Sequence, residues 1–487
     1  MSDRVWCKNC NIETNEEVCP VCGEMTVEDL PIEIYWCKHC YTPIIQVANQ
    51  VDKGTCPICG QKTKYLTTDI RPVFPEERLL LEILLDKKPN EYVKSSVWSV
   101  NSRYYIDGKS ISIPSGLFQT ADTDGISAKL KEYESGNTYE YFNEHIKTFI
   151  AANRNRLNHL KDESFDFVRR TASKFDEERL VISFSGGKDS TVTADVVTKA
   201  LSNPSLVHIF GNTTLEFPST VAYAERFREN HPQAIFLFAK NDEQVFMDVC
   251  EDIGPPARMM RWCCSMFKTG PITRVINSLY RNQQILTFYG IRKSESVSRS
   301  KYNRVEDDAE SVKIQQQTVA SPIFFWKDID IWLYMLAEDV DFNYRVYKNV
   351  KTVFFTKKCL LHYRILEQSA IHGYDANVKN KFQYPLSKIA SYMKTNNERD
   401  LKAYYSFAAI SYIVICQNGV VRNDKISNTE KKRQIMEISK EEWVKDLFQN
   451  MKYVSIPLSR KIIVWCSKQR MYLMMLIAVG IRRRLKK

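Results

Sequence analysis

Short apolar runs alternate with helical segments over residues 174–347. Four of the runs have the length and composition of buried strands: Leu180–Phe184, Leu206–Phe210, Ala234–Phe238 and Ile285–Tyr289. The segments Ser190–Leu201 and Ser219–Asn230, which lie between them, are helical in pattern. Continuously apolar strands separated by helices are typical of a parallel sheet that is covered on both faces. The pattern therefore predicts an α/β domain over these residues.

Residues 66–173 have a different pattern, which predicts a small α+β insert domain and a helical linker. Val97–Tyr105 and Lys109–Ile113 are expected to be short strands, and Asp107-Gly108 between them is a hairpin signal. Glu132–Phe175 is expected to be mainly helical, because its apolar residues recur at helical spacings. No motif in this segment indicates chemistry.

Eight of the fourteen cysteines precede residue 60, in two similar blocks. Val5–Cys10 (VWCKNC) is echoed by Tyr35–Cys40 (YWCKHC), and each block ends in a second Cys-Pro-x-Cys-Gly turn. Two such turns complete a tetrahedral sulfur site that suits zinc. The predicted ligand sets are Cys7, Cys10, Cys19, Cys22 and Cys37, Cys40, Cys56, Cys59. The repeat favours this sequential pairing over a cross-braced one, and rubredoxin-like iron is the alternative metal.

These metal sites are expected to be structural. Four cysteine ligands leave no open position for a substrate. Residues 1–65 are also too few to bury a core of their own, so metal binding would drive their folding. The sequence therefore predicts a tandem zinc-ribbon region that holds two Zn²⁺ ions.

The composition is that of an ordinary globular protein, with 44% apolar and 26% charged residues. The longest largely apolar stretches, Ala408–Cys416 and Met471–Ile481, are much shorter than the ~20 residues that span a bilayer. The N-terminus MSDRVWCKNC lacks the pattern of a signal peptide. Cysteines without an export signal indicate metal or redox chemistry in a reducing compartment. We therefore expect a cytoplasmic protein with no membrane partner.

The net charge of +11 is concentrated in the basic C-terminal region, residues 348–487. Val421–Lys487 contains 17 Lys and Arg against 6 Asp and Glu, a balance of +11. This region is either a solvated tail or a contact for nucleic acid. In the second case, the zinc ribbons would also contact the nucleic acid. A helical pattern occurs around Lys440–Gln449.

The turn Ser185–Ser190 (SGGKDS) directly follows the first apolar strand and precedes a helix. Its two glycines let the backbone turn tightly and direct N–H groups at an anion, which the helix N-terminus also attracts. Lys188 supplies a positive charge for a phosphate, and Asp189 can cap the helix or help hold Mg²⁺. The turn is not a GxxxxGK[ST] loop, so γ-phosphate transfer is disfavoured.

Three further segments follow in order: Asn212–Pro218 (NTTLEFP), Arg261–Cys264 (RWCC) with Lys268, and Gly290–Ser296 (GIRKSES) with Arg299. Together with the SGGKDS turn, they resemble the phosphoadenosine phosphosulfate reductase family of the adenine nucleotide α-hydrolase-like superfamily. The resemblance covers about Leu180–Tyr347. It implies a doubly wound parallel sheet that binds an adenine nucleotide at the carboxyl ends of its strands.

The resemblance also implies which residues act. The nucleotide would be held, with Mg²⁺, by Ser185, Gly186, Gly187, Lys188, Asp189, Ser190, Asn212, Gly290, Arg292 and Arg299. The catalytic candidates are Lys188, Asp189, Arg292 and Cys263. Taken by itself, an arginine loop such as the one after Gly290 is more often a solvated turn than a binding site.

The sequence departs from the family's reductases in its cysteines. Thioredoxin-dependent members carry a nucleophilic cysteine in a C-terminal Glu-Cys-Gly-Leu-His tail, and neither Cys416 nor Cys466 has that context. Iron–sulfur members add a Cys-x-x-Cys to the Cys-Cys pair, whereas Cys359 is followed by His362 at the corresponding place. An iron–sulfur cluster from Cys263, Cys264 and Cys359 is therefore incomplete. The Cys-Cys pair is equally well interpreted as partly buried thiols.

Three functions are consistent with these features. The leading hypothesis is an enzyme that cleaves ATP between the α- and β-phosphates, adenylylates an acceptor and releases pyrophosphate. Its setting would be sulfur transfer or nucleic-acid thio-modification, with protein partners from a sulfur-transfer system. The alternatives are a sulfonucleotide reductase and a non-catalytic zinc-ribbon adaptor that binds nucleic acid.

Overall fold

The computed structural model describes residues 5–7, 10, 12–14, 16–26, 31–47, 53–100, 103–114, 117, 123–246, 248–249, 262–281, 283–296, 299–307, 317–344, 417 and 419–440. The chain divides into two compact units. The first comprises Met1–Asn212, Ser219–Lys240 and Lys268–Leu361, and the second comprises Thr213–Pro218, Asn241–Phe267 and His362–Lys487.

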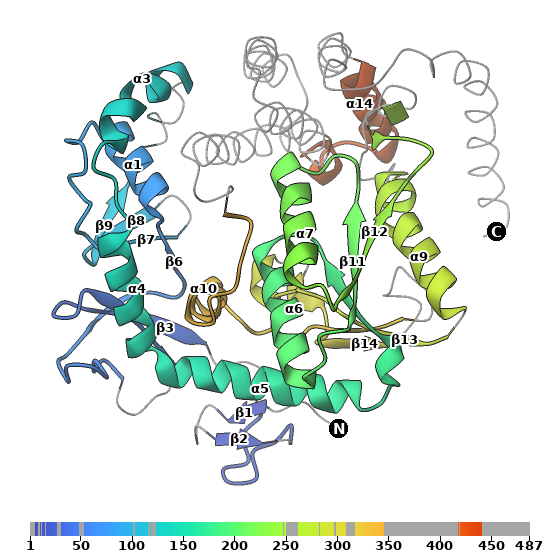
Figure 1. Cartoon of the computed structure of the whole chain (residues 1–487), viewed down its shortest axis with the longest axis horizontal. Coiled ribbons are helices and arrows are strands. Elements are labelled where there is room, and N and C mark those ends of the chain that lie inside the picture. The colour runs from blue at the N-terminus through green and yellow to red at the C-terminus, as the bar shows by residue number, and fades with distance from the viewer. Residues whose placement is uncertain are drawn as a thin grey trace. The chain divides into compact units, whose positions relative to one another are not determined.

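A six-stranded sheet of the described residues forms the centre of the first unit (Figure 1). Its strand order is β12 (Ile235–Lys240), β11 (Val207–Asn212), β10 (Leu180–Phe184), β13 (Ile285–Phe288), β15 (Gln317–Ala320) and β14 (Val305–Asp307). All neighbouring strands are parallel except β14, which is antiparallel to β15. The four predicted strands are confirmed to within two residues. The sequence did not indicate β14 and β15, because these short strands contain polar residues and lack a continuous apolar run.

Helices cover both faces of this sheet, as the doubly wound class requires. Helices α6 (Lys188–Leu201) and α7 (Pro218–Asn230) lie on one side of β11 and β12, and α9 (Gly270–Tyr280) lies on the other (Figure 1). Ile182 of β10 belongs to the apolar cluster that includes α6 and α7, whereas the adjacent Val181 packs with Ile276 and Tyr280 of α9. Burial on both faces explains why these strands are apolar at successive positions.

The insert contains a four-stranded antiparallel sheet of β6 (Arg71–Pro72), β7 (Val97–Val100), β8 (Arg103–Ile106) and β9 (Lys109–Ser112). The predicted single strand Val97–Tyr105 is wrong. It divides into β7 and β8, which pair with each other, and the polar residues Asn101 and Ser102 separate them in the sequence. The predicted Asp107-Gly108 hairpin is confirmed: both residues have positive φ, as a tight two-residue turn requires.

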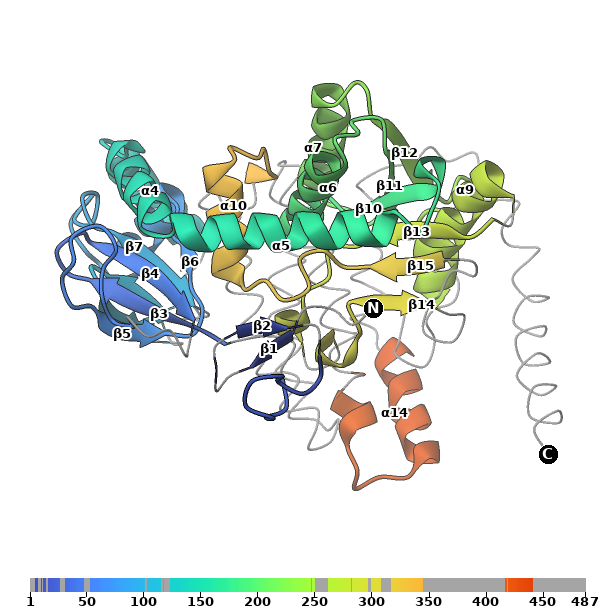
Figure 2. The ribbon, with the colours of Figure 1, turned by 90° about the horizontal axis from the view of Figure 1, so that it is seen from below.

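Four helices of the described residues accompany this sheet: α1 (Pro75–Leu84), α3 (Thr123–Glu134), α4 (Glu140–Ala152) and α5 (Arg154–Ala172). The prediction of a mainly helical Glu132–Phe175 is confirmed by α4 and α5. Figure 2 shows the long helix α5 running from α4 to the six-stranded sheet, where it contacts α6. No helix of the described residues is long and apolar enough to cross a membrane.

The cysteine-rich segment forms two small sheets. β1 (Val5–Cys7) pairs with β2 (Ile12–Thr14), and β3 (Ile32–Cys37) pairs with β4 (Thr42–Val47) and β5 (Lys64–Thr67). Asn153, between α4 and α5, attaches the second sheet to the helices. Its side-chain oxygen accepts the N–H of Ile45 at 2.7 Å, and its amide group donates to the carbonyl of Pro43 at 3.0 Å.

The second unit contains Cys263, Cys264 and an aromatic cluster of Phe246, Trp262 and Phe267, whose ring centroids lie 5.0–6.0 Å apart. Its helix α14 (Asn428–Lys440) ends where the predicted helical segment Lys440–Gln449 begins. The rest of that segment, and most of the basic C-terminal region, lie outside the described residues.

Candidate nucleotide site and metal centres

The eight N-terminal cysteines form two groups of four. Cys7, Cys10, Cys19 and Cys22 make one group, and Cys37, Cys40, Cys56 and Cys59 make the other. Within each group all sulfur atoms lie within 4.8 Å of one another. The sequential pairing that the repeat favoured is confirmed, and the cross-braced one is not formed.

The second turn of each group has the same backbone hydrogen bonds. Gly23 donates to the carbonyl of Cys19, and Gly60 donates to the carbonyl of Cys56, both at 2.9 Å. A backbone bond also runs from Cys10 to the sulfur of Cys7, and one from Cys40 to the sulfur of Cys37, both at 3.3 Å. The sequence repeat therefore corresponds to a repeated local structure that aims sulfur atoms at one point.

The donor atoms fit a tetrahedral metal ion. Sulfur atoms about 2.3 Å from a tetrahedral ion lie about 3.8 Å from one another. The separations of Cys37 from Cys59 and of Cys40 from Cys56 are 3.6 and 3.9 Å. The hydrogen bond with Cys22, then burial, raise the pKa of the Cys10 thiol to about 12. In the second group, burial raises the pKa of the Cys40 thiol, whereas the backbone hydrogen bond with Gln61 lowers the pKa of Cys59 to about 7. A cation would balance the thiolates that metal binding requires, and both groups can bind a metal.

The SGGKDS turn connects the carboxyl end of β10 to the first residue of α6. The hydroxyl of Ser190 accepts the backbone N–H of Ser185 at 3.1 Å and donates to the carbonyl of Gly187 at 2.9 Å. The hydroxyl of Thr191 donates to the same carbonyl at 3.0 Å. These bonds hold the turn closed over the N-terminus of α6, where the helix dipole favours an anion.

Gly290 brings the end of β13 against this turn. A Cβ atom at residue 290 would lie 2.7 Å from the backbone carbon of Asp189 and from the backbone nitrogen of Ser190. Only glycine therefore permits this approach of the two backbones. The approach lets Arg292, two residues later, reach the side chain of Asp189.

Two cations and two carboxylates meet at the turn. Lys188 Nζ lies 2.9 Å from Asp189 Oδ2 and 3.0 Å from Asp328 Oδ1. Arg292 lies 2.6 Å from Asp189 Oδ1 through Nε and 3.2 Å from Asp328 Oδ1 through Nη2. Burial by itself would raise the pKa of Asp328, but the charges of Lys188 and Arg292 outweigh it and lower that pKa. The four side chains therefore form a partly buried cluster whose two positive and two negative charges balance.

The other predicted nucleotide residues are placed as follows. Asn212 is the last residue of β11, next to β10, so it lies at the carboxyl edge of the sheet. Arg299 forms an ion pair with Glu295, and its side chain is 39% exposed. Arg292 is the more buried of the two predicted arginines, with 6% of its side chain exposed. Their part in binding stays a prediction.

Cys263 and Cys264 belong to the second unit, whereas the SGGKDS turn belongs to the first. Both thiols are half-buried, in agreement with the interpretation as partly buried thiols. Cys359 and His362 lie outside the described residues, so the iron–sulfur hypothesis stays open.

Sequence reasoning missed Asp328 and Asp69. Asp328 is the first residue of α10 (Asp328–Ala337), and an acidic residue before an apolar helical run was the available signal. Asp69 accepts the backbone N–H groups of Asp328 and Ile329 at 3.1 Å. No local pattern indicates Asp69, because 259 residues separate it from Asp328.

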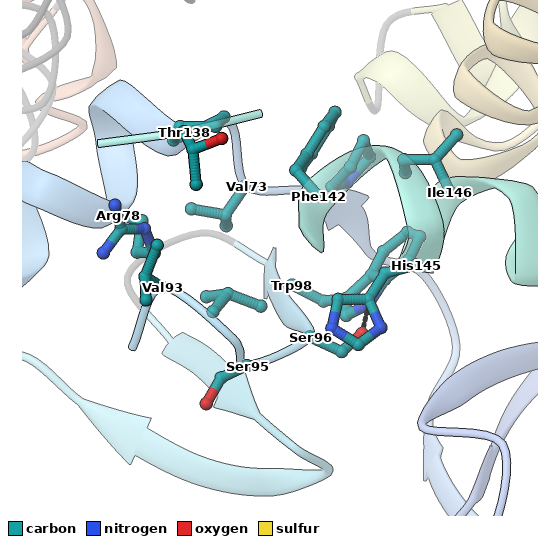
Figure 3. A pocket seen from close by; sticks show the side chains of 13 residues that line it. Val73, Arg78, Val93, Ser95, Ser96, Trp98, Thr138, Phe142, His145 and Ile146 are labelled. Carbon is teal, nitrogen blue, oxygen red and sulfur yellow. Dashed lines mark hydrogen bonds between the residues drawn. The ribbon is translucent and has the colours of Figure 1, made fainter. Parts of the chain in front are cut away.

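A small pocket in the insert lies among α1, β7 and α4, with Arg78, Trp98, Phe142 and His145 around it (Figure 3). Arg78 is paired with Glu82 and donates to two asparagine side chains. His145 Nε2 lies 3.0 Å from the carbonyl oxygen of Lys94. Because its charged and titratable side chains already have partners within the chain, this pocket indicates packing of the insert.

Comparisons with known proteins agree with the resemblance. Residues 179–353 match the family model described as Phosphoadenosine phosphosulfate reductase domain. The matched segment contains the SGGKDS turn, Gly290, Arg292 and Asp328. The recognition of this domain and of its fold class is confirmed.

Curated relatives match the same part of the chain. An uncharacterized protein of Methanocaldococcus jannaschii is 30% identical over 44% of this chain and 42% of its own length. Sulfate adenylyltransferase subunit 2 of Marinobacter nauticus is 24% identical over 41% of this chain and 70% of its own length. Adenosine 5'-phosphosulfate reductase of Staphylococcus saprophyticus is 22% identical over 34% of this chain and 64% of its own length.

The chain spans less than half the length of the Methanocaldococcus relatives that it matches. Among solved structures, phosphoadenylyl-sulfate reductase of Candida auris matches with a TM-score of 0.30 and 16% identity, over 39% of this chain and 89% of that chain. The names of the Marinobacter and Staphylococcus relatives describe adenylyl and sulfonucleotide chemistry.

Proposed function

We propose that this protein cleaves ATP between the α- and β-phosphates, adenylylates an acceptor and releases pyrophosphate. The acceptor would be a sulfur-transfer substrate or a nucleic acid that undergoes thio-modification. In this reaction a nucleophile of the acceptor forms a bond to the α-phosphorus. The bond from that phosphorus to the bridging oxygen breaks, and its electron pair leaves with pyrophosphate.

The observation that carries the proposal is the partly buried cluster of Lys188, Arg292, Asp189 and Asp328 at the N-terminus of α6. A departing pyrophosphate is strongly anionic, and preorganised cations stabilise such charge as it develops. Asp189 and Asp328 hold Lys188 and Arg292 beside the turn. On nucleotide binding, phosphate oxygens would replace these carboxylates as partners of the two cations. The names of the sulfate adenylyltransferase relatives describe transfer of the same group.

The carboxylates are suited to Mg²⁺. Asp189 and Asp328 both reach Lys188 Nζ, so their oxygens converge beside the turn. Carboxylates together with substrate phosphates are the usual ligands of Mg²⁺. A bound Mg²⁺ would neutralise phosphate charge, and Asp189 would be its first protein ligand.

We also propose that each N-terminal cysteine group holds one structural Zn²⁺. Four sulfur donors at tetrahedral spacing support zinc, and they leave no position for a substrate. In the second module, the metal would fix β3 relative to β4 and β5.

Product analysis with the full chain tests the proposed reaction. Wild-type protein with ATP, Mg²⁺ and candidate acceptors is expected to produce pyrophosphate and an adenylylated product or AMP. Lys188→Ala is expected to lower the rate by about 10²–10³, the usual cost of losing one preorganised electrostatic contact. Lys199→Ala is the matched control, because Lys199 lies in the same helix and pairs with Asp195 and Glu338. Release of ADP and phosphate, or equal rates in both variants, would contradict the assignment.

A sulfonucleotide reductase is the second candidate. The adenosine 5'-phosphosulfate reductase relative favours it, and Cys263 would supply the thiolate. The thiolate would attack the sulfur of the sulfonucleotide and form an S-sulfocysteine while the bond from sulfur to the phosphate oxygen breaks and the nucleotide leaves. An external thiol would then attack the cysteine sulfur, form a disulfide and release sulfite. Thiol-dependent release of sulfite, lost in Cys263→Ser, would establish this reaction in place of adenylylation.

A further inference from the structure

The segment that follows β5 contributes one residue, Asp69, that contacts the start of α10 beside the nucleotide site. β5 ends at Thr67, and Asp69 lies two residues later, before β6. Its carboxylate accepts the N–H of Asp328 through Oδ2 and the N–H of Ile329 through Oδ1, both at 3.1 Å. The first N–H groups of a helix have no partner within the helix. A distant part of the chain therefore caps α10.

Asp328 is held from two sides. Its backbone N–H is bound by Asp69, and its carboxylate contacts Lys188 at 3.0 Å and Arg292 at 3.2 Å. We propose that Asp69 is a positioning residue for the nucleotide site, because it fixes the start of α10 so that Asp328 holds Lys188 and Arg292 at the SGGKDS turn. This inference rests on the proposed nucleotide function.

Asp69 is a half-buried carboxylate with acidic neighbours. Burial, and then the charge of Asp328, raise the pKa of Asp69 to about 6, although the two backbone N–H groups oppose the shift. The titratable groups that face it from α10 are Asp328 and Asp330, both acidic. On the strand after it, Arg71 is engaged by Glu77. Lys188 and Arg292 pair with Asp328, and Arg156 pairs with Asp330.

Calorimetric titration of the full chain with ATP and Mg²⁺ at pH 7.5 tests the proposal. Asp69→Asn keeps one acceptor oxygen, removes the charge and turns its amide NH2 group toward the second backbone N–H. It is expected to bind ATP about three- to tenfold more weakly, the range for a charge at a helix N-terminus. Asp69→Glu keeps the charge and both acceptor oxygens, so it is expected to recover part of the lost affinity.

The matched control is Asp86→Asn, since Asp86 is an exposed carboxylate that pairs with Lys129 at 2.6 Å. It is expected to leave the affinity unchanged. Equal affinity of Asp69→Asn and the wild type for ATP would overturn the inference. A wild type that binds no adenine nucleotide would instead overturn the proposed function, and the inference with it. If Asp69→Asn does not fold, Asp69→Ser supplies a neutral cap, and failure of both to fold would show a purely structural residue.

Discussion

Replacing Gly290 by alanine would separate two backbones that now touch. The new Cβ would lie 2.7–2.8 Å from three backbone atoms of Asp189 and Ser190. Non-bonded carbon atoms rest about 3.5–4.0 Å apart, so β13 or the start of α6 must move by about 1 Å. No rotamer change can relieve the contact, because all three neighbours are backbone atoms. Inserting a methyl group into such a site costs about 1–3 kcal/mol.

This cost is expected to lower the melting temperature by roughly 2–10 °C. The displacement also moves Asp189 away from Arg292, so ATP affinity should fall by about tenfold or more, because a 1 Å misplacement is costly. Thermal unfolding and calorimetric titration of the full chain measure the two effects. Gly211→Ala is the stability control, since its Cβ would meet only the flexible end of Ile272, at 3.2 Å. A Gly290→Ala variant that melts and binds like the wild type would refute the close approach.

Three further predictions concern other parts of the chain. Metal analysis of the full chain should find two zinc ions, and Cys37→Ser should reduce this to one; unchanged zinc content would show that the second site is misassigned. Asp330→Asn breaks a buried two-bond pair with Arg156 at 2.9 Å and should cost about 3–5 kcal/mol in urea unfolding, whereas a loss below about 1 kcal/mol would mean that the pair adds little. Nucleic-acid binding by the ribbons and the basic tail should weaken steeply with salt and on deletion of Lys468–Lys487; salt-independent binding would contradict this electrostatic interpretation.

Much of the sheet could be predicted because its strands are buried on both faces. In β10, Val181 and Ile182 pack on opposite sides, so the strand is apolar at successive positions and, apart from Ser183, throughout, which makes its sequence easy to recognise. The polar edge strands β14 and β15 lack that signal. The cysteine groups were predictable because each set is defined by local spacing and by the repeat.

The electrostatic partners of the turn could not be predicted in the same way. The sequence placed Lys188 and Asp189 at a helix N-terminus, because a glycine-rich turn after a strand is a local feature. Asp328 contacts Lys188 across 140 residues of chain, and Asp69 contacts Asp328 across 259. Such pairs depend on how distant elements pack together, which no local pattern encodes. The segment after residue 66 therefore gave no indication of chemistry, although Asp69 reaches the site.

Calorimetric titration of the full chain with ATP and Mg²⁺ tests the central claim most directly. The claim is that the SGGKDS turn, with Lys188 and Arg292, holds the phosphates of an adenine nucleotide. Wild-type protein is expected to bind ATP at one site, and Lys188→Ala to bind at least about tenfold more weakly while melting within a few degrees of the wild type. Absence of binding to any adenine nucleotide, with or without Mg²⁺, would contradict the account.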